Sequence, residues 1–262
     1  MVSSLPQTRG CRAGSSACRS RAAIGCSLPY RRCQVAPAAA LAGQWPSELG
    51  APAAPSSARG PVPVRIEQPA DPSAPAVVVA STAIAAPASA VWDALTAYES
   101  LGDFKVPGLL VNRCLERRER GCVLYQVAGQ DLPFGAQVRA ACKLEVTEHP
   151  QGLPAAAMDR RPGAGGSRFP WPVGSLRGRP VHGDISFELL EGDFDHFKGL
   201  WRVQQGLAGP SSAWLSYALR VLPHMWLPAT IVQGQLREQI AANMETVRAH
   251  VEAKHAAQAR RE

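Results

Sequence analysis

The sequence predicts an α+β fold: a curved antiparallel sheet of about six to seven strands that wraps around a long C-terminal amphipathic helix. Residues 111–221 contain several segments in which apolar and polar side chains alternate, the pattern of half-buried strands. The connections between most of them are short, which favours a meander. A sheet with one apolar face needs a cover, and the last segment of the chain supplies an amphipathic helix.

The C-terminal helix is predicted over residues 229–254. Its apolar residues recur at spacings of three or four and form one stripe: Val232, Leu236, Ile240, Met244, Val247 and Val251. Each could contribute roughly 1.5–3 kcal/mol if fully buried. That is enough to hold the helix against the apolar face of the sheet.

The folded part begins with a β-branched strand over residues 77–85. Pro87 suits a first helical turn, and a helix with Val91, Leu95 and Tyr98 on one face follows. A second short helical piece is expected over 101–110, where Pro107-Gly108 signals a turn.

Strands are predicted next over residues 111–118, 123–127 and 137–148. In the second, we expect Tyr125 and Val127 to face the helix and Gln126 to face away. A last strand covers residues 212–221.

The clearest hairpin spans residues 185–203, with a polar turn from Glu191 to Gly199. Asp184 and Glu188 alternate with Ile185 and Phe187, which predicts that both carboxylates face solvent.

Residues 150–181 form a long Gly/Pro/Arg-rich insertion between two strands. A long structureless loop in a compact domain is functional or disordered, and this composition favours a flexible loop. The alternative is a lid over a cavity, with Phe169 and Trp171 as its anchors.

The N-terminal residues 1–45 have the composition of an organelle transit peptide, rich in Arg and Ser and poor in acids. Their Ser content and small residues favour the chloroplast over the mitochondrion. Residues 46–75 read as a Pro/Ala-rich linker and 257–262 as a disordered tail, so the domain is expected over 76–256.

The positive charge of the chain is concentrated in the same N-terminal region. Residues 1–64 hold seven arginines and one acid, so they carry +6 of the total +7. The remainder is nearly neutral, and we expect no nucleic-acid partner. Three cysteines lie beyond this region, Cys114, Cys122 and Cys142; their spacing matches no metal site, and we expect all three to be packing residues.

Three stretches resemble the START-like helix-grip superfamily, in particular the polyketide cyclase/dehydrase and lipid-transport family and its coenzyme Q-binding START-domain group. They are IAAPASAVWDALTAYESLGDF (84–104), ISFELLEGDFDHFKGLWRV (185–203) and residues 214–249 with the Pro-flanked MWLP. The resemblance covers about residues 77–255, apart from the insertion. It implies a hydrophobic pocket between sheet and helix, and ligands such as isoprenoid quinones or lipids.

The first functional hypothesis is a non-enzymatic carrier or chaperone of a hydrophobic small molecule, most likely an isoprenoid quinone or lipid, with no other cofactor. Apolar walls with a few polar tips suit a prenylated ring. The expected pocket residues are Tyr125, Val127, Phe187, Trp201, Tyr217, Leu236, Ile240 and Met244. The opposing interpretation is that these residues simply fill a core.

The second hypothesis is a cyclase- or dehydratase-like enzyme that uses acid–base residues. The candidates are His182, Asp184, Glu188, Asp193, Asp195 and His196. Most are predicted on a solvent-facing side of a strand or in a turn, where polar residues are expected without any catalytic role, and this interpretation is favoured. No catalytic residue and no metal ligand is therefore assigned.

The third hypothesis is a docking scaffold with a filled core that makes peripheral membrane contact. Met225, Trp226 and Leu227 lie between two prolines at the tip that joins the last strand to the helix. An apolar tip of this kind could enter a membrane interface.

Overall fold

The computed structural model describes residues 60–261 except 72, 132–136, 160–167 and 225–228. The chain divides into two units, 1–34 and 35–262, and all described residues belong to the second. The predicted transit peptide and the membrane-contact candidates Met225, Trp226 and Leu227 lie outside the described residues.

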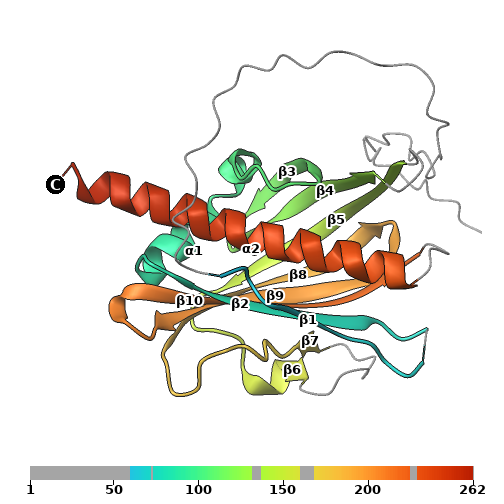
Figure 1. The fold of residues 1–262 in the computed structure, drawn as a ribbon, viewed down its shortest axis with the longest axis horizontal. Helices are drawn as coiled ribbons and strands as arrows, with labels where there is room; N and C mark the ends of the chain where they lie inside the picture. Colours follow the sequence, from blue (N-terminus) through green and yellow to red (C-terminus); the bar gives the residue numbers. More distant parts are fainter. Residues whose placement is uncertain (1–59, 72, 132–136, 160–167, 225–228, 262) are drawn as a thin grey trace, which may run out of the picture. The chain divides into compact units, whose positions relative to one another are not determined.

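The core of the second unit is an antiparallel sheet whose strands lie in the order β1-β2-β10-β9-β8-β5-β4-β3 (Figure 1). The α+β prediction is confirmed, with eight strands rather than six or seven. The strands are β1 (Val64–Glu67), β2 (Ala76–Ile84), β3 (Leu109–Arg118), β4 (Gly121–Asp131), β5 (Gln137–His149), β8 (Val181–Gly192), β9 (Phe194–Gly206) and β10 (Gly209–Pro223).

Strand β1 accounts for the additional strand, and it lies inside the segment expected to be a linker. It pairs with β2, with Val64 opposite Ala80 and Glu67 opposite Val77. Val62, just before it, is only 5% exposed and belongs to the core. The short apolar–polar alternation of these residues was obscured by the Pro/Ala-rich sequence around it.

Helix α2 (Ala229–Ala259) crosses the inner face of the sheet, as predicted, and extends five residues beyond the expected end (Figure 1). Ile240, Met244, Val247 and Val251 are buried, and Leu236 is partly buried against the core. The side chain of Val232 lies outside the described residues. No helix in the described part of the chain is long and apolar enough to span a membrane.

Two short helical segments precede β3. Helix α1 (Ala88–Thr96) begins after Pro87, and the 3-10 helix η1 (Tyr98–Asp103) follows it. Val91, Leu95 and Tyr98 are buried, as the helical spacing indicated. Gly108 has a φ of 77°, which confirms the turn expected at Pro107-Gly108.

The central hairpin turns more tightly than predicted. Strand β8 continues to Gly192 and β9 begins at Phe194, so Asp195 and His196 belong to a strand and not to a loop. Asp193 accepts a 2.9 Å hydrogen bond from the Ala141 amide nitrogen, which fixes the turn to β5. The polar sequence here stabilises a tight turn, whereas we had expected a long turn from Glu191 to Gly199.

The described residues of the 150–181 insertion pack on the outer face of the sheet, opposite α2 (Figure 1). We call its described residues, 150–159 and 168–181, the cover segment. It contains η3 (Ala155–Ala157), β6 (Met158–Asp159) and β7 (Phe169–Pro170), and the last two form a parallel pair. The expectation of a flexible loop is wrong for these residues, and because they lie on the outer face they do not form a lid over the inner one.

Buried polar contacts hold the cover segment in place. The Trp214 indole nitrogen donates to the Gly174 carbonyl oxygen at 2.7 Å, and Arg220 pairs with Asp159 at 3.3 Å. The Lys198 ammonium lies 4.4 Å from the centre of the Phe169 ring. Lys198 and Arg220 are only 6% and 1% exposed, because the cover segment lies over them.

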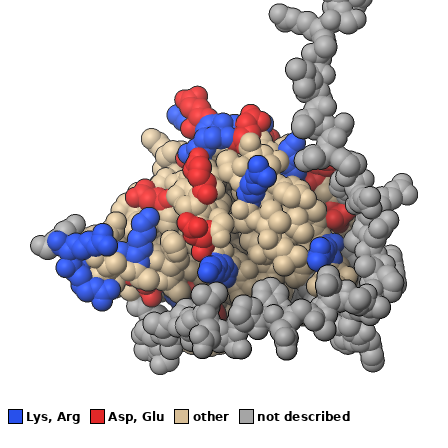
Figure 2. Space-filling model, turned by 90° about the horizontal axis from the view of Figure 1, so that it is seen from above, with Lys and Arg blue, Asp and Glu red and all other residues tan. Residues whose placement is uncertain are grey.

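The face seen in Figure 2 carries intermixed acidic and basic side chains. Basic side chains gather at the free end of α2 (Figure 2). The chain has Lys254 in the last turns of this helix, and Arg260 and Arg261 directly after its end. This face is therefore not a continuous basic surface.

Candidate functional site

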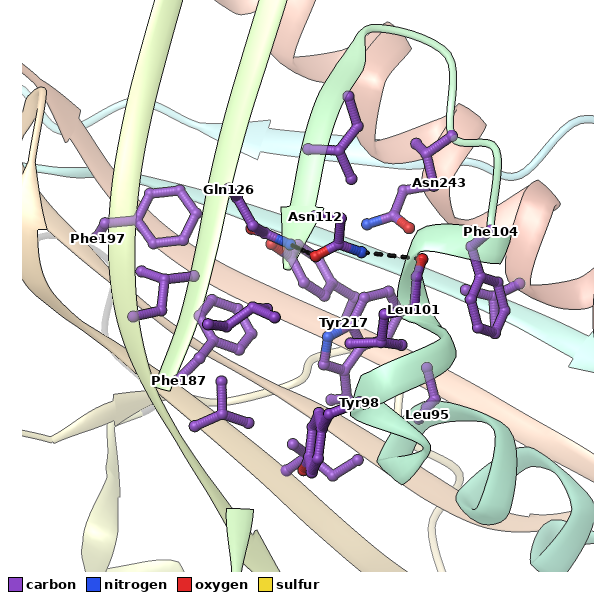
Figure 3. Close-up of a pocket in the computed structure, with 18 residues that line it drawn as sticks. Leu95, Tyr98, Leu101, Phe104, Asn112, Gln126, Phe187, Phe197, Tyr217 and Asn243 are labelled. Carbon is purple, nitrogen blue, oxygen red and sulfur yellow. Dashed lines mark hydrogen bonds between the residues drawn. The ribbon is translucent and has the colours of Figure 1, made fainter. Parts of the chain in front are cut away.

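A cavity of about 110 Å³, partly open to solvent, lies between the inner face of the sheet and the helical segments η1 and α2 (Figure 3). Its position follows from the curvature of the sheet, whose far strands β3–β5 and β8 lie away from the part of the sheet that α2 contacts. Its lining residues are Leu95, Tyr98, Leu101, Phe104, Val106, Leu109, Asn112, Leu124, Gln126, Leu144, Val146, Ile185, Phe187, Phe197, Trp201, Tyr217, Asn243 and Val247.

Three of the residues expected to line a pocket meet at this cavity: Phe187, Trp201 and Tyr217. The Tyr217 ring stacks on Phe187, with centroids 5.8 Å apart and planes 18° apart, and its centroid is 4.6 Å from that of Trp201. They come from β8, β9 and β10, and period-two alternation places them all on the inner face.

Tyr125 and Val127 do not line the cavity, and the face assigned to this strand was wrong. Their neighbours Leu124 and Gln126 point inward. Tyr125 pairs laterally with Arg113 and Lys143, residues of the outer face. The assignment failed because it was made from the alternation of this strand alone, whereas pairing with the buried residues of the neighbouring strand, such as Leu144 opposite Leu124, decides which side chains point inward.

Leu236, Ile240 and Met244 also lie outside the cavity lining. They pack in the core instead, with Met244 fully buried. Helix α2 presents Asn243 and Val247 to the cavity, one edge of the predicted stripe. The stripe identified the buried face of the helix, but not which side of that face meets the sheet and which meets the cavity.

The polar part of the cavity is a group of neutral amides that sequence reasoning missed. Gln126 Nε2 donates to Asn112 Oδ1 at 3.1 Å, and Asn112 Nδ2 donates to the Leu101 carbonyl oxygen at 3.2 Å (Figure 3). Asn243 faces them from α2. A polar residue on an amphipathic strand is normally read as solvent-facing, so alternation alone gave no signal for Asn112 and Gln126.

The described lining contains no carboxylate, histidine, lysine or arginine, and its titratable groups are two tyrosines. Burial raises the pKa of Tyr217 far above its ordinary value. Burial and the neighbouring Glu148 do the same for Tyr98. Both phenols therefore remain protonated at neutral pH, and neither is a general base.

The acid–base candidates lie elsewhere. Asp184 is fully buried on the outer face, where its carboxylate binds Arg202 under the cover segment, so the prediction that it faces solvent is wrong. Glu188 is half exposed and pairs with Lys198 at 3.0 Å. Asp195 pairs with His224 at 2.5 Å on the surface. The other candidates, His182, Asp193 and His196, likewise do not line the cavity.

The three cysteines of the domain are free thiols and pack as expected. Cys122 and Cys142 are buried, and burial raises the pKa of each thiol to about 12. Neither is therefore a thiolate nucleophile at neutral pH.

The family model for polyketide cyclase / dehydrase and lipid transport matches residues 84–248, more than half of the chain. None of the curated proteins matches the sequence.

Three solved structures are similar to this chain at low sequence identity, and the first of them shows the same fold. A STAR-related lipid transfer protein from Xanthomonas axonopodis is 11% identical with a TM-score of 0.52; 76% of this chain and 97% of that one are covered. A START superfamily protein from Mycobacterium smegmatis is 15% identical with a TM-score of 0.44; 68% of this chain and 97% of that one are covered. The Zhui aromatase/cyclase from Streptomyces sp. R1128 is 14% identical with a TM-score of 0.45; 67% of this chain and 93% of that one are covered.

With its sheet curved around a C-terminal helix and a cavity between them, the chain belongs to the START-like polyketide cyclase / dehydrase and lipid transport family.

Proposed function

We propose that this protein binds a hydrophobic small molecule without transforming it, and that the ligand is an isoprenoid quinone or a lipid with a compact polar head. The observation that carries the proposal is the lining of the inner cavity: apolar and aromatic walls with three neutral amides and no described acid–base pair. Such a site can orient a polar group but cannot transfer a proton at neutral pH. The family's lipid-transport members support the same class of ligand.

The size of the cavity favours a ring over a whole lipid. An apolar cavity of about 150 Å³ holds a benzene molecule. The inner cavity, at about 110 Å³, is close to that size and is partly open. A quinone ring would occupy it while the isoprenoid tail leaves through the opening, and some widening of the walls would accompany binding.

The polar groups suit a carbonyl or hydroxyl on that ring. Gln126 and Asn243 present amides, and Tyr217 presents a phenol. A phenol that stays protonated donates a hydrogen bond, which a quinone carbonyl accepts. The Phe187 and Trp201 rings beside Tyr217 offer faces for aromatic stacking.

Mass spectrometry tests the proposal directly. The full chain is expressed in a quinone-producing host, and the protein is analysed under native and then denaturing conditions. A stoichiometric quinone or lipid supports the proposal. Protein that carries nothing, and that does not bind added quinones or lipids, contradicts it.

A variant that fills the cavity localises the ligand. Val247→Trp adds an indole to a wall of the inner cavity, whereas Ala253→Trp adds the same group to an exposed position of α2. The first should lose the co-purifying ligand and the second should retain it. Equal retention by both variants would place the ligand elsewhere.

We also propose that residues 1–45 direct the protein to the chloroplast, with the mitochondrion as the alternative. The support is the Arg- and Ser-rich, acid-poor composition. A fluorescent fusion to residues 1–75, imaged in plant or algal cells, tests this. Cytosolic fluorescence would contradict it.

A further inference from the structure

The cover segment forms a second hollow on the outer face of the sheet, on the other side from the inner cavity. Its volume is about 620 Å³, within the range of small-molecule sites in proteins. Strands β8 and β9 supply its floor. The lining residues that matter for a ligand are Trp171, Val173, Leu176, Arg177, Arg179 and Arg202.

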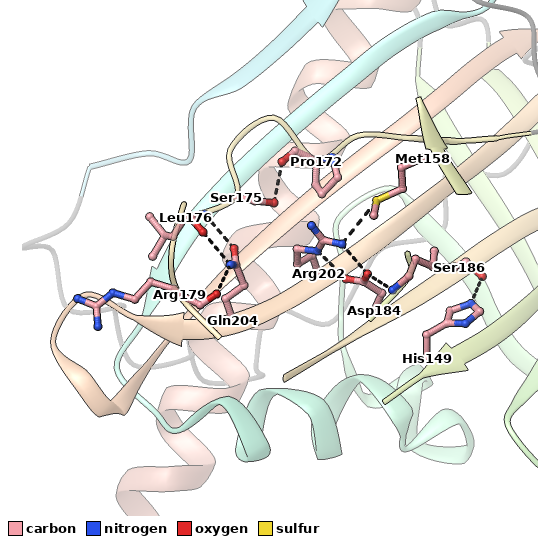
Figure 4. Close-up of polar contacts among 11 residues, drawn as sticks. His149, Met158, Pro172, Ser175, Leu176, Arg179, Asp184, Ser186, Arg202 and Gln204 are labelled. Carbon is pink, nitrogen blue, oxygen red and sulfur yellow. Dashed lines mark hydrogen bonds and ion pairs between the residues drawn. The ribbon is translucent and has the colours of Figure 1, made fainter. Parts of the chain in front are cut away.

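The floor of this outer hollow carries one buried guanidinium with hydrogen-bonding capacity left over. Arg202 is only 5% exposed. Its Nε and Nη2 donate to Asp184 at 2.8 and 2.7 Å, and Nη2 also approaches the Met158 sulfur at 3.5 Å. Its Nη1 makes no hydrogen bond to a described residue and, in Figure 4, points away from Asp184. Two N–H groups are thus available on a side chain that water barely reaches.

The other polar side chains of the floor already have hydrogen-bond partners within the protein. Gln204 Oε1 accepts from the Leu176 amide at 2.9 Å, and its Nε2 donates to the carbonyl oxygens of Leu176 and Arg179 (Figure 4). Asp184 accepts a third hydrogen bond, from the Leu153 amide at 2.7 Å. The Asp184 charge is therefore neutralised within the floor, and Gln204 anchors the rim.

The walls combine apolar surface with positive charge. The Trp171 ring centre lies 5.2 Å from the Arg202 guanidinium carbon, and Val173 and Leu176 add aliphatic surface. Arg177 and Arg179 stand at the rim, and none of the described lining residues is acidic. With Arg202 balanced by Asp184, the two rim arginines give the hollow a net positive charge.

We propose that this outer hollow is a second binding site, for an organic anion that combines a carboxylate with an apolar body. The carboxylate accepts hydrogen bonds from Arg202 Nη1, a charge-assisted contact to a side chain that is largely buried. The apolar body lies against Trp171 and the aliphatic walls, and the rim arginines attract the anion. The site is separate from the inner cavity, whose polar groups are neutral, so the two select different ligands.

The test compares two probes that share a twelve-carbon chain, dodecanoate and 1-dodecanol, by isothermal titration calorimetry on the full protein. Arg177→Gln/Arg179→Gln removes two rim charges without altering the buried floor. Arg113→Gln/Arg120→Gln removes the same charge from exposed positions on β3 and the β3–β4 turn, remote from the hollow.

Dodecanoate affinity should fall roughly 3- to 20-fold in the rim variant, because each exposed ion pair is worth up to about 1 kcal/mol, and should stay unchanged in the remote variant. It should also weaken with added salt. Equal losses in the two variants would reduce the effect to net charge and overturn the proposal, as would a failure of dodecanoate to bind at all.

The Val247→Trp variant separates the two sites. Dodecanoate should still bind to it, and amide resonances of Leu176 and Gly178 should shift on titration while those of Asn243 and Val247 do not. Loss of dodecanoate binding in Val247→Trp would place the anion in the inner cavity and overturn the proposal. Loss of a co-purifying quinone or lipid in the same variant bears only on the inner cavity.

Discussion

The Asp184–Arg202 ion pair is buried, and the structure predicts what breaking it costs. Both side chains are nearly inaccessible, and two hydrogen bonds of 2.8 and 2.7 Å join them. At an effective dielectric constant of about 20, unit charges about 4 Å apart attract by about 4 kcal/mol. Asp184→Leu leaves the guanidinium buried without a counter-charge, so we expect the free energy of unfolding to fall by about 3–5 kcal/mol.

The double variant Asp184→Leu/Arg202→Met should recover much of this loss, since apolar replacement of both partners of a buried pair is often neutral. A remainder of about 1–3 kcal/mol is expected, because the Leu153 amide loses its acceptor. Urea denaturation followed by tryptophan fluorescence measures all three variants. Their double-mutant cycle should give a coupling energy near 3 kcal/mol, the upper end for neighbouring residues.

The exposed pair Arg118–Glu145, whose side chains are 41% and 43% exposed, is the matched control. The cycle of Arg118→Met and Glu145→Leu should give less than about 1 kcal/mol. The reasoning fails if the two cycles give the same coupling energy, or if Asp184→Leu costs less than about 1 kcal/mol. Either result would mean that water screens the Asp184–Arg202 pair more strongly than the burial of the two side chains implies.

Three further predictions concern pH, packing and ligand choice. Burial lowers the pKa of His149 and His196, and nearby cations add to the effect at His196. Just below the ordinary histidine pKa of about 6.5, the unfolded chain therefore binds more protons than the folded one, so the free energy of unfolding should be undiminished above that pH and decline as the pH falls through it. Urea midpoints measured at pH 7.5 and 5.5 should show this decline. If a His149→Gln/His196→Gln variant declines just as much, these two histidines are not its cause. Gly199→Ala should destabilise the fold by about 1–3 kcal/mol, because a Cβ there would lie 2.5 Å from Phe187 Cζ and would meet the Ala218 carbonyl oxygen. An unchanged urea midpoint would show that the Phe187 side chain, a wall of the inner cavity, can move to make room. Gln126→Leu should weaken the binding of a short-chain quinone several-fold and leave the binding of an alkane of similar size unchanged, since only the quinone accepts a hydrogen bond. Equal effects on both ligands in calorimetry would show that Gln126 does not orient the quinone.

The secondary structure was largely predictable, because alternation and helical spacing report which residues are buried together. The stripe of α2 and the inner face of β5 and β10 follow the sequence pattern closely. Strand β1 escaped prediction since four residues are too few to establish a period. In β4, the two side chains expected inside lie outside, because the register set by β3 and β5 overrides the hydrophobicity of Tyr125 and Val127.

The candidate site was predictable only in its aromatic wall. Phe187, Trp201 and Tyr217 are apolar residues on well-patterned strands, so period-two reasoning placed them correctly. The amides of Asn112 and Gln126 carry the opposite signal, since polar residues on a half-buried strand usually face water. Their burial depends on the fold of the chain over them: η1 receives the hydrogen bond from Asn112 across eleven residues.

By itself, the sequence carried the resemblance to the family, and it determined the antiparallel sheet and the amphipathic helix that covers it. The sheet and the helix follow from local patterns of apolar residues and from short connections. Tertiary structure decided the rest. The Gly/Pro/Arg-rich insertion has the composition of an unfolded loop, yet the buried cations of β9 and β10 bind it to the outer face. Those cations are buried only because the insertion covers them. This mutual dependence joins segments that are distant in the sequence, so the local pattern of the insertion or of the strands does not predict it.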